Sequence, residues 1–312
     1  MSTLICGSLA YDTIMVFEGR FRDHILPDQL HILNVAFLVP SMRREFGGTG
    51  GNIGYNLHLL GGEPEIMATV GEDAKPYLDR LAALGLAGPS IRTIPGAFTA
   101  QAFITTDLDD NQITAFHPGA MNEAHTNHVA NARNPTLGIV APDGRQAMLQ
   151  HAREFHDAGI PFVFDPGQGL PMFDGAELRA FVDLAQFIAV NDYEAKLLSE
   201  RTGSSLEELA GAGKTLCVTR GAEGSHIYTR GSRLEIAPVK PRRIADPTGC
   251  GDAYRAGLLY GIAAGMDWET SGRLASTMGA LKIAEKGPQN HAPSRDEIAA
   301  SFHEAYGYRP WN

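Results

Sequence analysis

A glycine-rich stretch near the carboxyl end, D-P-T-G-C-G-D, has the residue types of an anion-binding site. Gly249 and Gly251 flank Cys250, and Asp252 follows as an apolar helical pattern begins. Glycines permit a tight turn, and the first amides of a helix lack partners within it, so this stretch suits phosphate. A carboxylate beside a phosphate can accept the proton of an attacking hydroxyl, which makes Asp252 the candidate base of a phosphoryl transfer. The alternative is an ordinary helix cap.

A second glycine-rich stretch, G-G-T-G-G-N, precedes another helical pattern. It is not a dinucleotide-binding fingerprint, because Ile53 stands where a third glycine is needed, and Asn52 replaces the lysine of a Walker A loop. Gly47–Gly51 allows close backbone approach to a ligand, and the Asn52 amide can both donate and accept. With Asp12, at the end of the first predicted strand, these residues suit a polyol or a ribose. A structural turn with a helix cap remains the alternative.

Two weaker patterns lie in the carboxyl half. Asn191 and Glu194, in N-D-Y-E, follow a predicted strand and lie on one helical face, where they suit a hydrated Mg²⁺ near phosphates. The same spacing is common in capping boxes. The turn Thr219–Gly224, T-R-G-A-E-G, offers backbone amides to a nucleotide, although most such turns are hairpins.

Composition limits the possible partners of these sites. The net charge of −10 over 312 residues argues against a nucleic acid and against an anionic membrane surface. The three cysteines are far apart in sequence, so we expect reduced thiols in a cytoplasmic protein with no signal peptide or membrane span. Cys250, at a helix start, is predicted to have a lowered pKa and to be the most reactive thiol.

Short apolar strands alternate with helical patterns along most of the chain. The predicted strands include Leu4–Ser8, Leu137–Val140, Phe162–Phe164, Phe187–Val190 and Thr215–Thr219. This alternation predicts a mostly parallel sheet covered by helices on both faces, with sites at the carboxyl ends of the strands. A hairpin of Ser225–Thr229 and Leu234–Ala237, then helices at 251–264 and 267–285, complete the predicted fold.

Two segments, about 13–38 and 97–119, do not fit this alternation. Their β-rich pieces, Thr13–Phe17 with His31–Val39 and Phe98–Thr105 with Gln112–Phe116, predict a small lid sheet. No linker divides the rest, so the sequence predicts a single α/β domain over 1–312 with the lid inserted.

Taken in order, these motifs resemble those of the PfkB (ribokinase-like) family of carbohydrate and nucleoside kinases. D-P-T-G-x-G-D-A-x-R-A-G, N-x-Y-E and D-P-G-Q at Asp165–Gln168 look most like the prokaryotic adenosine kinases. The resemblance covers nearly the whole chain. It implies a three-layer α/β/α core with a small β lid, and ATP- and Mg²⁺-dependent phosphorylation of a ribose 5′-hydroxyl.

The resemblance also implies a role for each candidate residue. Asp252 would be the base, and the anion hole would consist of Gly249, Cys250 and Gly251. The nucleoside site would be formed by Ser8, Asp12, Gly48, Asn52, Phe116 and Gln168, and the ATP site by Asn191, Thr219, Gly221 and Gly224. Glu194 would bind Mg²⁺ through water, and a monovalent cation such as K⁺ would lie near Asp246, Thr248 and the 284–290 loop.

Three functions stay open. The first is a purine nucleoside kinase; Ala102 stands where related enzymes often have an aromatic residue, so adenosine, inosine and guanosine are all candidates. The second is a sugar kinase of the same family, which Phe116 and Gln168 disfavour. The third is a non-catalytic binding protein, which Asp252 disfavours. A homodimer formed through a lid strand edge is also left open.

Overall fold

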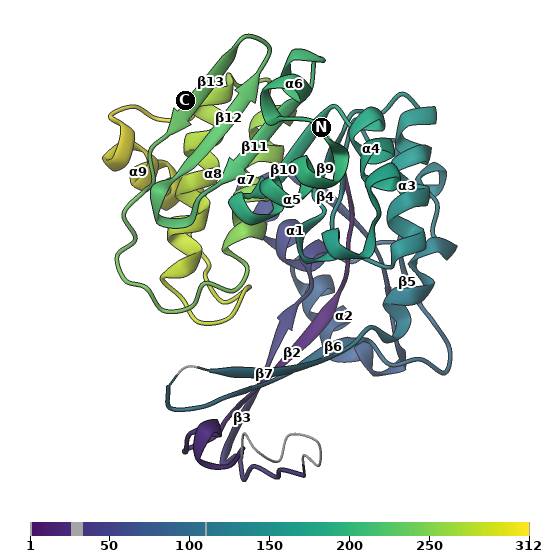
Figure 1. Ribbon diagram of the computed structural model, residues 1–312, viewed down its shortest axis with the longest axis vertical. Helices are drawn as coiled ribbons and strands as arrows, with labels where there is room; N and C mark the ends of the chain where they lie inside the picture. Colours follow the sequence, from purple (N-terminus) through teal and green to yellow (C-terminus); the bar gives the residue numbers. More distant parts are fainter. Residues whose placement is uncertain (1, 26–33, 110, 312) are drawn as a thin grey trace.

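In the computed structural model, residues 2–25, 34–109 and 111–311 are described, and within them nine strands form one large sheet. The strand order is β13-β12-β11-β10-β9-β8-β1-β4-β5 (Figure 1). Seven strands run parallel: β1 (Ser2–Cys6), β4 (Glu63–Val70), β5 (Ile91–Thr93), β8 (Leu137–Val140), β9 (Phe162–Phe164), β10 (Phe187–Asn191) and β11 (Thr215–Thr219). The antiparallel hairpin β12 (Ser225–Thr229) and β13 (Ser232–Ile236) extends one edge.

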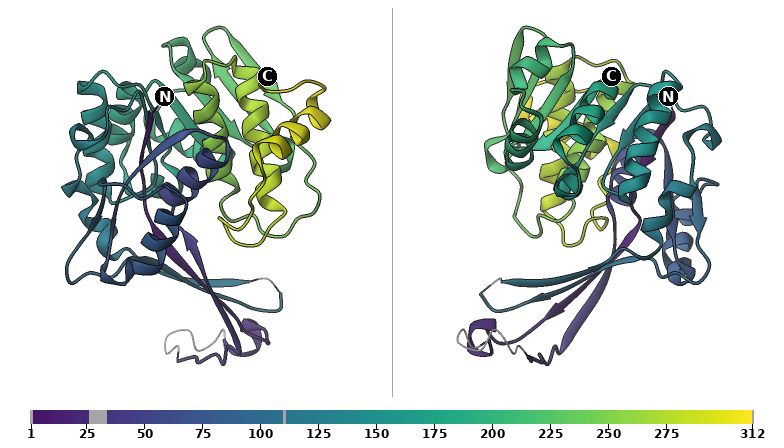
Figure 2. Two further views of the ribbon diagram at one scale, coloured as in Figure 1. Left: turned by 180° about the vertical axis from the view of Figure 1, so that it is seen from behind. Right: turned by 45° about the vertical axis from the view of Figure 1, so that its right-hand side comes forward.

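Helices cover both faces of this sheet (Figures 1 and 2). One face packs α3 (Arg145–Asp157), α4 (Gly175–Leu184), α5 (Asp192–Thr202) and α6 (Leu206–Gly211); the other packs α1 (Thr49–Leu59), α7 (Cys250–Ala263) and α8 (Trp268–Ile283). The side chains of β1 alternate between these cores: Leu4 joins Phe155 on one face, and Ile5 joins Leu258 on the other. The predicted α/β/α class is confirmed.

Two further helices pack at the margins of these layers. α2 (Lys75–Ala83) places Tyr77 and Leu81 against side chains of β4. α9 (Arg295–Tyr306) places Phe302 against Leu274 and Met278 of α8. No helix in the described ranges is long and apolar enough to cross a membrane.

A second sheet projects away from the layered core (Figure 1). Its strands are β2 (Ala10–Val16), β3 (Ser41–Gly47), β6 (Ala100–Thr106) and β7 (Gln112–His117), in the order β3-β2-β6-β7. β2 pairs with β3 antiparallel and with β6 parallel, so two segments distant in sequence meet in one small sheet. β7 is exposed along its whole length.

One predicted lid strand is wrong. Residues 34–39 form no strand, residues 31–33 lie outside the described ranges, and β3 spans Ser41–Gly47 instead. Four consecutive residues of β3 are exposed, so its sequence lacks the alternation by which a half-buried strand is recognised. β1 ends at Cys6 rather than Ser8, and α6 and α9 were not predicted.

Candidate active site

The start of α7 has the backbone geometry of an anion site. Gly249 caps the helix at a φ of 79°, and a Cβ there would lie 2.8 Å from Cβ of Pro288, so this position needs glycine. The Cys250 amide donates to the Pro247 carbonyl (3.1 Å). Within the described residues, no hydrogen bond uses the Gly249 or Gly251 amide. The positive end of the helix dipole and these amides therefore favour an anion.

Asp252 lies in the first turn of α7 and faces α1. Its Oδ2 accepts a hydrogen bond of 2.8 Å from Nδ2 of Asn52, a residue 200 positions earlier in the chain. Burial raises the pKa of Asp252 to about 7, and the Asn52 hydrogen bond opposes that rise. A carboxyl group with a pKa near neutrality suits a general base.

The Asn52 side chain is held by residues that sequence reasoning missed. Nε2 of Gln289 donates to Oδ1 of Asn52 (3.0 Å) and to the Tyr77 hydroxyl (2.7 Å). That hydroxyl donates to the Gly47 carbonyl (2.7 Å), which closes the network onto the lid. Because its oxygen accepts from Gln289, the Asn52 amide must present its NH₂ group to Asp252. K-G-P-Q-N, just past a predicted helix, was the only signal in sequence for Gln289.

A buried ion pair lies behind Asp252. Arg255 donates from Nε (3.1 Å) and Nη2 (3.0 Å) to the two carboxylate oxygens of Asp165, and both residues are almost fully buried. Arg255 follows Asp252 by three positions, on the same face of α7, so the pair fixes this turn against the end of β9. Sequence reasoning quoted both residues within motifs but gave neither a role.

Asn191 and Glu194 form a capping box at the start of α5. The Asn191 side chain accepts from the Glu194 amide (2.7 Å), and Glu194 Oε2 accepts from the Asn191 amide (2.8 Å). Glu194 is buried, and its Oε2 lies 3.9 Å from Nη2 of Arg255. Burial, with Asp165 adding to it, raises the pKa of Glu194. Glu194 thus takes part in the cap of α5 and also lies beside the Asp165–Arg255 ion pair.

The candidate ribose residues lie where the lid leaves the core. Gly48 caps α1 at a φ of 83°, and the Ser8 hydroxyl accepts from the Thr49 amide (3.2 Å). Asp12, on β2, packs against Gly47, where a Cβ would lie 2.5 Å from Oδ2 of Asp12. Burial, followed by the charges of Asp246 and Glu45, raises the pKa of Asp12 to about 6.

Phe116, on the lid sheet, and Gln168, just after β9, are both exposed. Phe116 is on β7 of the lid, directly opposite Ala102 on β6, and is 49% exposed. Gln168 follows β9, at the carboxyl edge of the large sheet. Among the described residues, no hydrogen bond or ring contact joins either side chain to Asp252.

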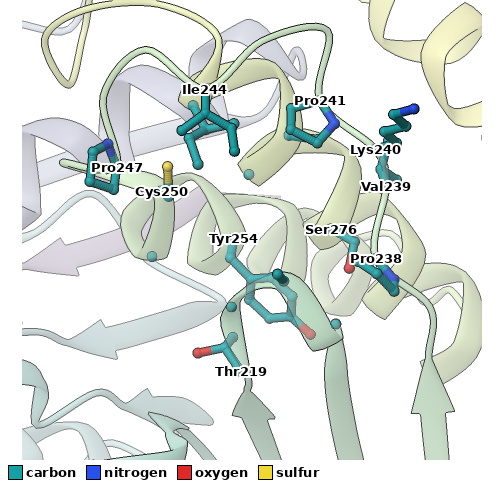
Figure 3. Close-up of a pocket in the computed structure, with 17 residues that line it drawn as sticks. Thr219, Pro238, Val239, Lys240, Pro241, Ile244, Pro247, Cys250, Tyr254 and Ser276 are labelled. Atoms are coloured by element: carbon teal, nitrogen blue, oxygen red, sulfur yellow. The ribbon is translucent and has the colours of Figure 1, made fainter.

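A cavity of 520 Å³ opens beside the start of α7 (Figure 3). It is lined mostly by apolar groups of the β11 turn, the 238–247 segment, α7 and α8, among them Thr219, Gly221, Gly224, Cys250, Tyr254 and Ser276. Figure 3 shows Cys250 and Tyr254 on successive turns of α7, with Pro247 beside Cys250 and Ile244 on the loop above them. Three of the four candidate ATP residues line this cavity, and Asn191 does not.

The predicted lowering of the Cys250 pKa is contradicted, whereas its predicted rank as the most reactive of the three thiols stays a prediction. The thiol is half-buried, and burial raises its pKa to about 11; Lys282 opposes the rise, whereas Asp246 and Asp252 add to it. Desolvation and carboxylates outweigh the field of the helix start, so the thiolate is disfavoured. Cys6 and Cys217 are buried free thiols.

The residues predicted to bind Mg²⁺ and those predicted to bind a monovalent cation lie in different environments. The described residues contain no group of three His, Cys, Asp or Glu side chains that could hold a metal ion. A lone carboxylate such as Glu194 fits Mg²⁺, which keeps waters and is often shared with substrate phosphates. At the predicted monovalent site, Asp246 accepts from the amides of Thr248 and Gly287 (both 2.9 Å), and the ammonium of Lys282 lies beside it.

Comparison with known proteins agrees with this arrangement. The profile described as "pfkB family carbohydrate kinase" matches residues 12–295. Nucleoside kinases of Methanocaldococcus jannaschii and Methanothermobacter thermautotrophicus are each 30% identical, over 85% and 96% of this chain and 88% and 98% of theirs. The structure of Burkholderia thailandensis nucleoside kinase with inosine is 58% identical, with a TM-score of 0.91 and coverage of 99% of this chain and 100% of that one. The same enzyme with ADP-inosine is 60% identical, with a TM-score of 0.88 and coverage of 99% and 97%.

Proposed function

Because the chain belongs to the pfkB family of carbohydrate kinases, we propose that it transfers the γ-phosphoryl group of ATP to the 5′-hydroxyl of a purine nucleoside. The observation that carries this proposal is the Asp252 carboxylate, hydrogen-bonded to Asn52 beside the free amides of the α7 start. A binding site for the transferred phosphoryl group and a proton acceptor thus share one helix turn. A protein that only binds its ligand has no need of that carboxylate.

In this mechanism Asp12 and Asn52 hold the ribose hydroxyls, and Ser8 and Gly48 line the same end of the site. Asp252 accepts the proton of the 5′-hydroxyl as the hydroxyl oxygen attacks the γ-phosphorus of ATP. The bond from that phosphorus to the β–γ bridging oxygen breaks, and ADP leaves. The free amides of Gly249 and Gly251 stabilise the charge that develops on the transferred group, and the Cys250 amide joins them when it leaves the Pro247 carbonyl. The Asn52 hydrogen bond orients the Asp252 carboxylate, and Gln289 fixes the orientation of Asn52.

The phosphate donor occupies the cavity beside α7. Its apolar walls suit a flat nucleotide base, and Thr219, Gly221 and Gly224 approach it from the β11 turn, with Asn191 nearby at the end of β10. Glu194 would hold Mg²⁺ through water, and the bound ion would neutralise charge on the phosphates. The ADP-inosine complex of the Burkholderia enzyme supports a nucleotide beside a nucleoside.

Base identity follows from the lid and the β9 edge. Phe116 stacks on the base, and Gln168 binds its polar edge. Ala102, opposite Phe116, leaves space that an aromatic residue would fill, so the pocket takes inosine and guanosine as well as adenosine. The inosine complexes of the 58–60% identical relative support a hypoxanthine base among the substrates.

A substrate panel tests this function. Adenosine, inosine, guanosine, ribose and fructose are offered with ATP and Mg²⁺, and ADP release is measured for each. A nucleoside is expected to have the highest kcat/KM. If ribose or fructose is phosphorylated better than any nucleoside, the chain is a sugar kinase. If ADP is released with none of the five compounds, the result contradicts a kinase role.

The role of Asp252 is tested by Asp252→Asn, which keeps the size and the hydrogen-bond acceptor. We expect kcat to fall by roughly 10²–10⁴, the range for a general base, while ADP affinity stays within about twofold. The matched control is Asp296→Asn, an exposed carboxylate in the first turn of α9. Turnover of Asp252→Asn within threefold of wild type would exclude the assignment.

A further inference from the structure

Lys282, in the last turn of α8, is a fully buried lysine outside the mechanism above, with an exposed fraction of 0%. Its Nζ donates to the carbonyls of Asp246 (2.8 Å) and Glu285 (3.1 Å). Burial lowers the pKa of Lys282, but Cys250, followed by the carboxylates of Asp246, Glu285 and Glu45, opposes this and favours the ammonium form. A buried charge is costly without such partners, so its position is specific.

This ammonium lies at the base of the anion hole. Asp246, whose carbonyl it binds, is the first residue of D-P-T-G-C-G-D, and Cys250 Sγ lies 3.9 Å from the same carbonyl. The charge of Lys282 is also the main influence that opposes the rise of the Cys250 pKa. Lys282 therefore acts electrostatically on the turn that would bind the transferred phosphoryl group.

The oxygen atoms around Lys282 leave little for a second cation. A bound K⁺ would need several oxygen ligands from the 245–248 and 283–287 segments. Instead, N–H groups already bond many of them: Ala245 N to Ile283 O (2.8 Å), Arg243 Nε to Ala284 O (2.6 Å), Thr248 N and Gly287 N to the Asp246 carboxylate (2.9 Å each), and Lys282 Nζ to the Asp246 and Glu285 carbonyls. The residues present therefore do not fit the implied cation site.

We propose that the Lys282 ammonium takes the place of that monovalent cation, so that the enzyme works without added K⁺. An ammonium and K⁺ carry the same charge, and both bind carbonyl oxygens. Lys282 differs in being covalently attached, so its charge is present at every salt composition. It is a positioning residue: it fixes Asp246 and the following turn, and its charge favours the phosphates. This inference rests on the proposed kinase activity.

The first test uses the wild-type enzyme. Initial rates with ATP, Mg²⁺ and inosine are compared in KCl, NaCl, NH₄Cl and tetramethylammonium chloride at equal ionic strength. Rates are expected to agree within about twofold, because the site already holds a fixed charge. Activation by K⁺ of about tenfold or more over tetramethylammonium would overturn the proposal.

The second test removes the ammonium with Lys282→Met. We expect kcat to fall by about tenfold to a hundredfold, the scale for losing charged hydrogen bonds, and K⁺ or NH₄⁺ to restore part of it while tetramethylammonium does not. The control is Lys75→Met, which replaces an exposed lysine of α2 that pairs with Asp79 and should behave like wild type. A loss that no small cation restores would show a merely structural role and overturn the proposal.

Melting temperature gives a readout that is independent of activity. K⁺ should raise the Tm of Lys282→Met but leave that of wild type unchanged, because only the variant has a site to fill. A K⁺-dependent Tm of the wild type would contradict the proposal even if no substrate is phosphorylated. If Lys282→Met does not fold, the dependence of the wild-type Tm and rate on K⁺ tests the proposal by itself. If no substrate of the panel is phosphorylated and K⁺ leaves the wild-type Tm unchanged, the proposed function is refuted but the proposal about Lys282 is not.

Discussion

Burial raises the pKa of Asp252, the proposed base, into a range in which its protonation state would control the rate. Its pKa of about 7 in the ligand-free protein means that the carboxylate, the form that accepts a proton, is lost as the pH falls through neutrality. The profile of kcat/KM against pH should therefore have an acid limb near pH 7, since this parameter reports the free enzyme. An acid limb near the usual Asp value, around pH 4, would contradict this environment.

Asn52 sets the position of that acid limb. Its hydrogen bond favours the charged form of Asp252, so removing it in Asn52→Ala should raise the Asp252 pKa further. We expect the acid limb of kcat/KM to move to higher pH, in addition to a higher KM from loss of the proposed ribose contact. The profile is measured with one nucleoside from pH 5 to 9. A limb that stays in place or moves to lower pH would show that Asn52 does not control this carboxyl.

At the scale of elements, the Asp165–Arg255 pair joins the end of β9 to α7. Arg255→Met leaves the Asp165 carboxylate buried without its partner, which typically costs about 3–5 kcal/mol. Urea unfolding should show this loss in the free energy of unfolding. The exposed pair of Lys75 and Asp79 is the control, since Lys75→Met should cost less than about 1 kcal/mol. Equal effects of the two substitutions would contradict the buried pair's structural role.

Some of these elements could be predicted from sequence, for a physical reason. Strands buried on both faces, such as Leu137–Val140 and Phe162–Phe164, are short apolar runs, and the structure has them at the predicted bounds. Glycine-rich turns also indicated the helices α1 and α7, although α1 begins at Thr49, within the stretch that was predicted to precede it. The exposed strand β3 carries no such pattern, so its predicted position was wrong.

Buried charges were harder to predict than buried apolar residues. Asp165 and Arg255 are 90 positions apart, and each looks like a surface charge until the fold brings them together. Lys282 and Gln289 likewise depend on partners from distant segments. Short-range patterns report burial and turns, whereas a polar network is determined by tertiary structure.

At the scale of the whole molecule, the lid sheet projects from the core and carries part of the proposed base site. Phe116 is an exposed aromatic residue with no apolar core to fill, which suits stacking on a ligand. Stacking is worth about 1–3 kcal/mol per base, so Phe116→Ala should raise KM for inosine by about tenfold. Ile113→Ala is the control, because Ile113 is on β7 but on the opposite face. Equal KM values for wild type and Phe116→Ala would place the base elsewhere.

The hydrogen bond between Asn52 and Asp252 has a consequence for biosynthesis. Its two residues are 200 positions apart, so no catalytic centre exists until most of the chain has left the ribosome. Until α7 and α8 emerge, the sheet face that carries Ile5 and Ile139 has no cover from them. The nascent chain therefore exposes an apolar surface during the last part of its translation, when it is most prone to aggregate and most in need of a chaperone.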